Sequence, residues 1–282
     1  MATAGEEALG LIAGSGSLPL EIARAARRRG RGVLALGFPG HTDERLAGEV
    51  PEVIWLAPGR LEAALEALRA GRVREAVLAG KLPKLLLFRE GESLELDALA
   101  REALGRLPDR RDGSVLALVV ETLHGRGIRI LPQAELVPEL LSGEGPLGRV
   151  RPSPAQSADI AFGWPVARAL AGLDVGQAVV VKDGAVLAVE ALEGTDAAIR
   201  RAGQLAPGAV VVKVARPAQD PRFDLPAIGA GTLAALREAR AGALAFEAGR
   251  TLVLEREALV READAAGIAL VGVAGPGPEA AP

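Results

Sequence analysis

The chain has 282 residues and a formal net charge of -3, which favours two domains over one hydrophobic core and argues against a basic nucleic-acid-binding face. It contains no cysteine and two histidines, which excludes disulfides, zinc–thiolate sites and metal centres built from several imidazoles. No apolar run approaches the roughly 20 residues that a membrane span needs, and Glu6 and Glu7 oppose a secretory signal, so we expect a cytoplasmic protein.

The first half of the chain alternates between short apolar strands and helices. This alternation predicts a parallel sheet with helices on both faces, a Rossmann-like arrangement. The predicted strands are Ala8–Ala13, Gly32–Phe38, Glu52–Ala57, Ala76–Gly80 and Ile128–Leu131. The predicted helices are Leu20–Arg29, Leu61–Ala70, Leu94–Leu107, Ser114–Gly125 and Ala134–Leu141.

A change of composition marks the expected domain boundary. Residues 142–154, SGEGPLGRVRPSP, combine glycine, proline and serine with isolated charges, which is typical of a linker. We place the boundary near Leu147. The predicted domains are an N-terminal Rossmann-like nucleotide-binding domain, 1–146, and a C-terminal catalytic domain, 147–282.

The second half is predicted to be a distinct mixed α/β domain. Asp183 and Gly184 supply the positive φ of a tight turn, which predicts a hairpin between Gln177–Val181 and Ala185–Glu190. The other predicted strands are Ala209–Ala215, Leu244–Glu247, Thr251–Leu254 and Ile268–Val273. The predicted helices are Ala155–Leu173, Thr195–Ala202, Thr232–Ala241 and Glu257–Ala266.

A glycine turn between the first strand and the first helix is the first candidate binding site. Backbone amides at a helix start suit a phosphate or a nucleotide. The GxG spacing lacks the third glycine of the dinucleotide fingerprint, and a plain tight turn is the alternative interpretation. The candidate substrate-binding residues are Gly14, Ser15, Gly16, Leu18 and Pro19.

A second candidate follows the strand that ends near Gly80. A loop at the carboxyl end of a parallel strand lies on the edge of the sheet where ligands bind. Gly80 and Lys81 are therefore candidate substrate-binding residues, with the lysine placed to meet a diphosphate. The alternative is a solvated lysine on a surface loop.

Three carboxylates gather at the predicted start of a helix in the second half. Glu190 and Glu193 lead into the turn, and Thr195 and Asp196 begin the helix. Capping alone explains the threonine and the aspartate, but it does not explain the two glutamates. We predict that Glu190, Glu193 and Asp196 bind a hard divalent cation, magnesium or manganese, and that Thr195 contacts the substrate.

The densest group of charged residues follows the predicted strand 209–215. Arginine pairs well with phosphate oxygens, and an aspartate can activate water or bind a metal. The alternative is a salt-bridged surface loop. The candidates are Lys213 and Gln219 for substrate binding and Asp220, Arg222 and Asp224 for catalysis.

Taken together, the chain resembles the LpxI family of UDP-2,3-diacylglucosamine pyrophosphatases, enzymes of lipid A biosynthesis. The resemblance covers nearly the whole chain. Its most specific blocks are DVGQAVVVKDGAVLAVEALEGTDAAIRRAG, KVARPAQDPRFDLPAIGAGTL and EAGRTLVLEREALVREADAAGIALVGV, and the shorter ones are GLIAGSGSLP, LAGKLPK and LPDRRDGSVL.

The resemblance implies magnesium-dependent hydrolysis of UDP-2,3-diacylglucosamine to UMP and lipid X, which is 2,3-diacylglucosamine 1-phosphate. The family's essential aspartate lies in an R-x-DLP segment, which matches Asp224, and this residue joins the predicted metal ligands. The resemblance also implies a glycolipid nucleotide substrate, peripheral contact with the inner-membrane surface and a homodimer, with no nucleic acid as partner.

Two other functions remain open from the sequence. One is a non-catalytic nucleotide-sugar or lipid-binding protein with the same two domains. The other is a dinucleotide-dependent oxidoreductase that uses the glycine turn near Gly14, which the missing third glycine disfavours.

Overall fold

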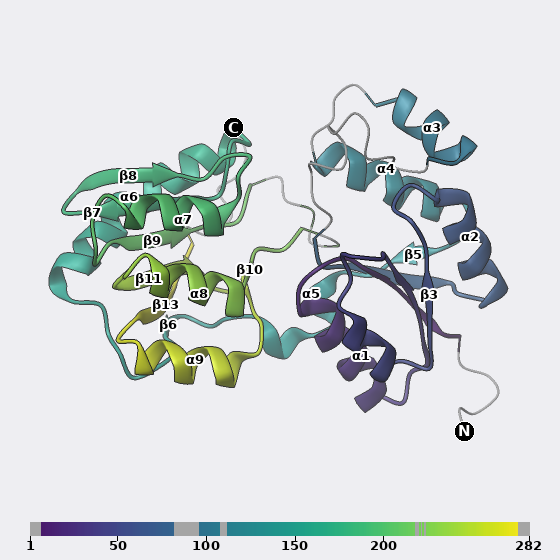
Figure 1. Ribbon diagram of the computed structural model, residues 1–282, viewed down its shortest axis with the longest axis horizontal. Helices are drawn as coiled ribbons and strands as arrows, with labels where there is room; N and C mark the ends of the chain where they lie inside the picture. The colour runs from purple at the N-terminus through teal and green to yellow at the C-terminus, as the bar shows by residue number, and fades with distance from the viewer. Residues whose placement is uncertain are drawn as a thin grey trace. The chain divides into compact units, whose positions relative to one another are not determined.

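The computed structural model describes residues 7–81, 96–107, 112–217, 220, 222 and 224–275 (Figure 1). The chain divides into two compact units, one of Met1–Pro138 with Asp220–Asp224 and the other of Glu139–Gln219 with Leu225–Pro282. Each unit is α/β, the first with a parallel sheet and the second with a mixed one. The predicted fold class is therefore confirmed.

The first unit is built on a parallel sheet with the strand order β3-β2-β1-β4-β5. Residues of its central strands are almost entirely buried, as expected for apolar strands that are covered on both faces. The strands are β1 (Leu9–Ala13), β2 (Val33–Gly37), β3 (Glu52–Trp55), β4 (Glu75–Ala79) and β5 (Arg129–Ile130).

Helices cover both faces of this sheet. Helices α2 and α4 pack on one face, where Leu68 and Leu123 are fully buried, and α1 packs on the other with α5 (Figure 1). Burying one leucine side chain contributes about 2 kcal/mol. The helices are α1 (Leu18–Arg28), η1 (Glu44–Gly48), α2 (Leu61–Ala70), α3 (Ala98–Gly105), α4 (Asp112–His124) and α5 (Gln133–Leu136).

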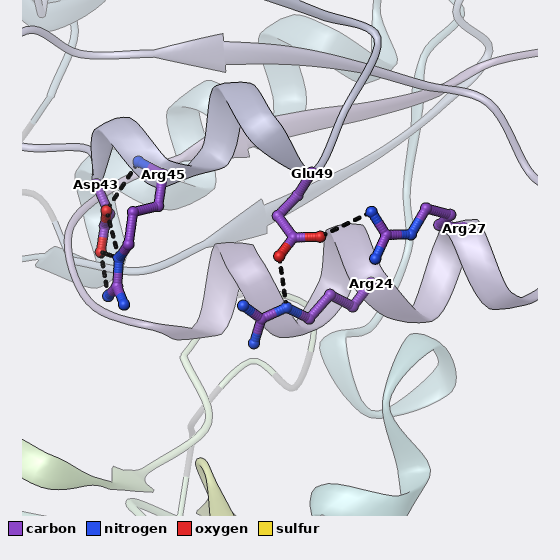
Figure 2. Close-up of polar contacts among 5 residues, drawn as sticks. All are labelled: Arg24, Arg27, Asp43, Arg45 and Glu49. Atoms are coloured by element: carbon purple, nitrogen blue, oxygen red, sulfur yellow. Dashed lines mark hydrogen bonds and ion pairs between the residues drawn. The ribbon is translucent and has the colours of Figure 1, made fainter.

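Ion pairs fix the connection between β2 and β3 against α1 (Figure 2). The carboxylate of Glu49 lies between Arg24 and Arg27, at N–O distances of 2.8 and 2.9 Å. Asp43 caps η1 by accepting the Arg45 backbone N–H at 2.9 Å, and it also pairs with the Arg45 guanidinium. The hydrogen bonds from Arg24 and Arg45 hold the pKa of Glu49 and of Asp43, respectively, below their usual values.

The second unit is built on a mixed sheet with the order β6-β13-β11-β9-β7-β8. Strands β9, β11 and β13 run parallel, while β6, β7 and β8 form antiparallel pairs. The strands are β6 (Gly145–Pro146), β7 (Ala178–Lys182), β8 (Ala185–Val189), β9 (Val210–Lys213), β11 (Ala243–Glu247) and β13 (Ala269–Val273). A short parallel pair is formed by β10 (Ala227–Ile228) and β12 (Leu252–Val253).

Helix α6 covers one face of this sheet, and α7, α8 and α9 cover the other (Figure 1). The helices are α6 (Pro154–Gly172), α7 (Thr195–Gly203), α8 (Ala230–Glu238) and α9 (Arg256–Ala265). Throughout the described ranges, no helix combines the length and the apolar character that crossing a bilayer requires.

The predicted hairpin of the second unit is confirmed. Asp183 and Gly184 have φ values of 49° and 74°, which is the positive region that a tight hairpin turn needs. The buried Asp159 of α6 accepts hydrogen bonds from both of their backbone N–H groups, at 3.1 and 2.8 Å. A buried carboxylate therefore fixes this turn.

The segment predicted as a linker is partly a strand. Gly145 and Pro146 form β6 and pair with β13 at the edge of the second sheet, where the missing N–H of proline is tolerated. In this part of the chain the first compact unit ends at Pro138 and the second begins at Glu139. The helix predicted over Ala134–Leu141 is interrupted at Val137, because Pro138 cannot continue it, and the 3-10 turn η3 (Pro138–Leu140) follows.

Replacing Glu49 by glutamine should lower the free energy of unfolding at neutral pH by about 1 kcal/mol or less, because Arg24 and Arg27 are 38% and 63% exposed. The pKa of Glu49 is lowered in the folded state. The Glu49 carboxylate therefore contributes fully to the free energy of unfolding above its pKa in the unfolded state. This contribution is lost as the pH falls through its pKa in the folded state. The difference between wild type and variant in urea denaturation should shrink in acid.

Glu44→Gln provides the control, since Glu44 is an exposed carboxylate in the same turn. This variant should unfold like the wild type at every pH. A Glu49→Gln difference that stays constant down to about pH 3 would contradict a role for the carboxylate charge.

Candidate functional site

The two loops predicted to bind substrate in the first unit lie at one point of its sheet. The strand order reverses at β1, because the chain moves outward to β2 and β3 and then returns to β4 on the other side of β1. Open parallel sheets bind ligands at the carboxyl ends of the strands at such a switch point. The loop after β1 carries Gly14–Gly16, and the loop after β4 carries Gly80 and Lys81.

The backbones of these two loops are joined directly. Ser15 and Lys81 exchange N–H to C=O hydrogen bonds of 2.8 and 3.0 Å, and the Ser15 hydroxyl donates to the same Lys81 carbonyl at 2.8 Å. A Cβ at Gly14 would lie 2.7 Å from the Lys81 carbonyl oxygen. Gly80 has φ +85°, and its Cβ would lie 2.5 Å from the Ser15 carbonyl oxygen. Gly14 and Gly80 are therefore required by this close approach.

The other predicted residues of this edge have different environments. Among the described residues, nothing lies within 4 Å of a Cβ built on Gly16, and Lys81 is exposed. Leu18 and Pro19, by contrast, are buried at the start of α1. Gly16, Ser15 and Lys81 are thus the predicted residues that a ligand at the switch point could meet.

The three carboxylates at the start of α7 each have a separate partner. Glu190 is buried and accepts hydrogen bonds from the Thr195 hydroxyl at 2.9 Å and from the Gln177 backbone N–H at 3.2 Å. These bonds join the end of β8 to the start of α7, so Glu190 and the buried Thr195 hold that turn.

Glu193 and Asp196 face different neighbours. Glu193 is exposed and pairs with Arg201 at 2.8 Å; its own backbone N–H and then Arg201 hold the pKa of Glu193 below its usual value. Asp196 accepts a hydrogen bond from the Thr232 hydroxyl of α8 at 3.1 Å. The turn predicted as a metal site is therefore a set of side-chain contacts that joins β8, α7 and α8.

A magnesium cage is not assembled among the residues that the structure describes. None of their aspartate, glutamate or histidine side chains form a group of three or more placed to hold a metal ion. Within the second unit, the predicted ligands Glu190, Glu193 and Asp196 do not come together as such a group. These residues do not fit a magnesium ion held by the protein alone.

The loop after β9 contains a local ion pair. The carboxylate of Asp220 accepts from the backbone N–H of Arg222 at 2.9 Å and from its guanidinium at 2.6 and 3.0 Å. The hydrogen bond to Arg222 lowers the pKa of Asp220, and the same bond raises the pKa of Arg222.

Asp224 follows this pair directly. Its backbone N–H donates to the Asp220 carbonyl at 3.0 Å, and the residue is half-buried. The structure therefore brings the three predicted catalytic residues into one turn. The predicted substrate-binding residue Gln219 lies outside the described residues.

Lys213, predicted to bind substrate, has a buried side chain. It is the last residue of β9 and 2% exposed, and its Nζ donates to the Ala227 carbonyl at 3.0 Å. At the end of the neighbouring strand β11, Glu247 is also 2% exposed and contacts Arg168 and Arg250. Sequence reasoning missed Glu247, although a charged residue that ends an apolar strand is the same signal that drew attention to Lys213.

The similarity of this chain to solved structures is low. The biotin carboxylase domain of a thermophilic 2-oxoglutarate carboxylase is 13% identical with a TM-score of 0.27, covering 70% of this chain and 32% of that one. Biotin carboxylase from Campylobacter jejuni has the same identity and TM-score and covers 70% and 41%. This chain spans less than half the length of either structure, and a likeness of this size supports no conclusion.

Sequence comparison is decisive for the family. A curated relative from Caulobacter vibrioides, the UDP-2,3-diacylglucosamine pyrophosphatase LpxI, is 35% identical over 279 residues, which is 94% of this chain and 97% of the relative. The model of the LpxI N-terminal domain matches residues 8–140, and that of the LpxI C-terminal domain matches residues 143–271. With both halves matched in order, the chain belongs to the LpxI family.

Proposed function

We propose that this protein hydrolyses the diphosphate of UDP-2,3-diacylglucosamine to UMP and lipid X in lipid A biosynthesis. The observation that carries the proposal is the end-to-end similarity to the Caulobacter pyrophosphatase, 35% identity over 94% of the chain. Because the similarity covers both halves, it is not a shared nucleotide-binding domain alone.

The turn around Asp224 supplies chemistry that suits this reaction. Hydrolysis of a diphosphate requires stabilisation of the phosphoryl charge and a positioned water molecule more than it requires covalent catalysis. Arg222 is a cation within the turn, and its pairing with Asp220 fixes its orientation. We assign to Asp224 the orientation of the attacking water, with metal binding as the alternative role.

The switch point of the first unit supports a place for the nucleotide part of the substrate. Backbone amides at the start of α1 and the exposed Lys81 are suited to phosphate oxygens. Ser17, the residue that caps α1, makes no side-chain hydrogen bond to the helix start. The N-terminal amides of α1 therefore do not depend on that side chain for a partner.

Magnesium enters the proposal as an ion that arrives with the diphosphate. Magnesium in proteins usually keeps several waters and takes one or two carboxylates together with substrate phosphates. Asp224 is our candidate for such a carboxylate, with manganese as the alternative ion. The partners of Glu190, Glu193 and Asp196 described above are consistent with roles in the turn instead.

Membrane contact and dimerisation complete the proposal. A diacylated substrate resides in the inner membrane, so we propose that the protein meets it by peripheral contact from the cytoplasmic side. We also propose a homodimer, as the family resemblance implies.

Asp224→Asn should lower the rate of UMP release from UDP-2,3-diacylglucosamine by about 10²–10⁴-fold, the range for loss of a group that handles a proton or a water. Asp183→Asn, an exposed aspartate in the hairpin turn, is the control and should keep wild-type activity. The measurement is UMP release with circular dichroism of both variants.

Wild-type turnover by Asp224→Asn would remove Asp224 from the reaction. Saturable binding of the substrate by wild type without any release of UMP, with magnesium, manganese or cobalt present, would instead favour a non-catalytic nucleotide-sugar or lipid-binding protein.

Removal of divalent ions with EDTA should abolish UMP release, and added magnesium should restore it. Since the described carboxylates form no cage, the free protein should show no saturable magnesium binding at about millimolar concentration in titration calorimetry. Asp196→Asn should leave the magnesium concentration for half-maximal rate unchanged. A tight magnesium site in the free protein, or a higher requirement in Asp196→Asn, would favour a metal site at the start of α7.

A further inference from the structure

The residues assigned to catalysis lie on one connection in the second half of the chain, residues 214–226, here called the Asp224 segment. It leaves the end of β9 at Val214 and enters β10 after Pro226. Its described parts include Asp220, Arg222 and Asp224, and both of its ends contact a buried charged residue of the second unit.

Glu247 holds the first end. This glutamate ends β11, and its Oε2 accepts the backbone N–H of Ala215 at 2.8 Å. Arg168 and Arg250 place guanidinium nitrogens 3.4 Å from the same carboxylate. Arg250 also donates to the Arg216 carbonyl at 3.1 Å, so two successive residues of the segment are attached to this group.

The burial of Glu247 makes this arrangement specific. Placing an ionised carboxylate in the core costs several kcal/mol unless it is paired and hydrogen-bonded. Here the charge is met by two arginines, while one oxygen contacts the main chain of the segment. A Cβ at Gly275 would lie 2.6 Å from Oε1, so the carboxylate is also packed against the chain after β13. Its orientation is thereby fixed.

Lys213 holds the second end. Its buried Nζ donates to the carbonyl of Ala227, the first residue of β10. The N–H of Leu252 in β12 donates to the Pro226 carbonyl at 2.8 Å, which secures the adjacent residue. The chain from Asp224 to Ala227 passes through Leu225 and Pro226 alone, so little slack separates the catalytic candidate from this attachment.

We propose that Glu247 and Lys213 are positioning residues that fix the two ends of the Asp224 segment and thereby orient Asp224 toward the substrate. The inference rests on the proposed function. Neither residue needs to touch the substrate, because each acts through the backbone: Glu247 at Ala215 and Lys213 at Ala227. Lys213 thus takes a positioning role in place of the substrate contact expected from the sequence.

Glu247→Gln, Arg250→Met and Lys213→Met test the two attachments. Each should lower kcat for UMP release by about 10–10²-fold, as expected when a catalytic group is misplaced by a fraction of an ångström. KM should change less than about threefold, because the variants do not alter groups that bind the substrate. Arg250 is 39% exposed, so its variant keeps the test valid if the buried Glu247 variant does not fold. Lys213→Arg keeps a donor and should recover most of the lost kcat.

Asp159→Asn is the matched control. Asp159 is a buried carboxylate of the same unit that likewise accepts backbone N–H groups, but those of the hairpin turn at Asp183 and Gly184. It should lower the thermal midpoint about as much as Glu247→Gln and leave kcat unchanged. Equal losses of kcat in the two variants would overturn the proposal in favour of general destabilisation.

Amide hydrogen exchange provides a readout that is independent of activity. Peptides containing Ala215–Arg216 or Asp224–Ala227 should exchange faster in Glu247→Gln and Lys213→Met, respectively, and like wild type in Asp159→Asn. Wild-type exchange together with wild-type kcat in the test variants would also overturn the proposal. If the wild-type protein releases no UMP, the proposed function fails, and exchange alone then decides whether these residues order the segment.

Discussion

The central strands of both sheets are covered on both faces, so their side chains are buried whichever way they point. Polar side chains are accommodated in such a sheet mainly at the positions where its strands end. In the first unit these places are Ser15 and Lys81, after β1 and β4. In the second they are Lys213 and Glu247, at the ends of β9 and β11. Ser15, Lys81 and Asp224 accordingly lie on connections that begin where a buried strand ends.

Most charged groups at these edges are balanced by the protein itself. Glu193 pairs with Arg201, Asp220 pairs with Arg222, and Glu247 is met by two arginines. Such pairs order loops, and their net attraction for a free ion is small because each charge is already neutralised. Under the proposed function this suits a substrate that supplies its own charge, a diphosphate with its accompanying cation. The protein's contribution is then chiefly the geometry of the Asp224 segment.

The sequence predicted the strands and helices well where apolar runs were continuous, and the hairpin turn at Asp183 and Gly184 follows from local backbone preferences. The strand β6 was not predicted, because Gly145 and Pro146 carry no strand signal and pair only through contact with distant β13. The contact partners of the charged residues could not be predicted from the sequence either. Glu190 contacts Gln177, and Glu247 contacts Arg168, across separations that only the folded sheet brings together. Spacing along the chain identified which charged residues lie at strand ends. It could not show whether their side chains contact a ligand or another residue of the protein.

The bond between Ala215 and Glu247 has a consequence for how this segment can vary among related proteins. The Glu247 carboxylate contacts the main chain of Ala215 and not its side chain, so position 215 requires a residue with a backbone N–H. Because Ala215 is fully buried, the residue must also be small. Alanine, glycine and serine meet both conditions, whereas proline, otherwise common in this loop, has no N–H to donate. We therefore expect few substitutions at Ala215 among related proteins, although its side chain carries no reactive group.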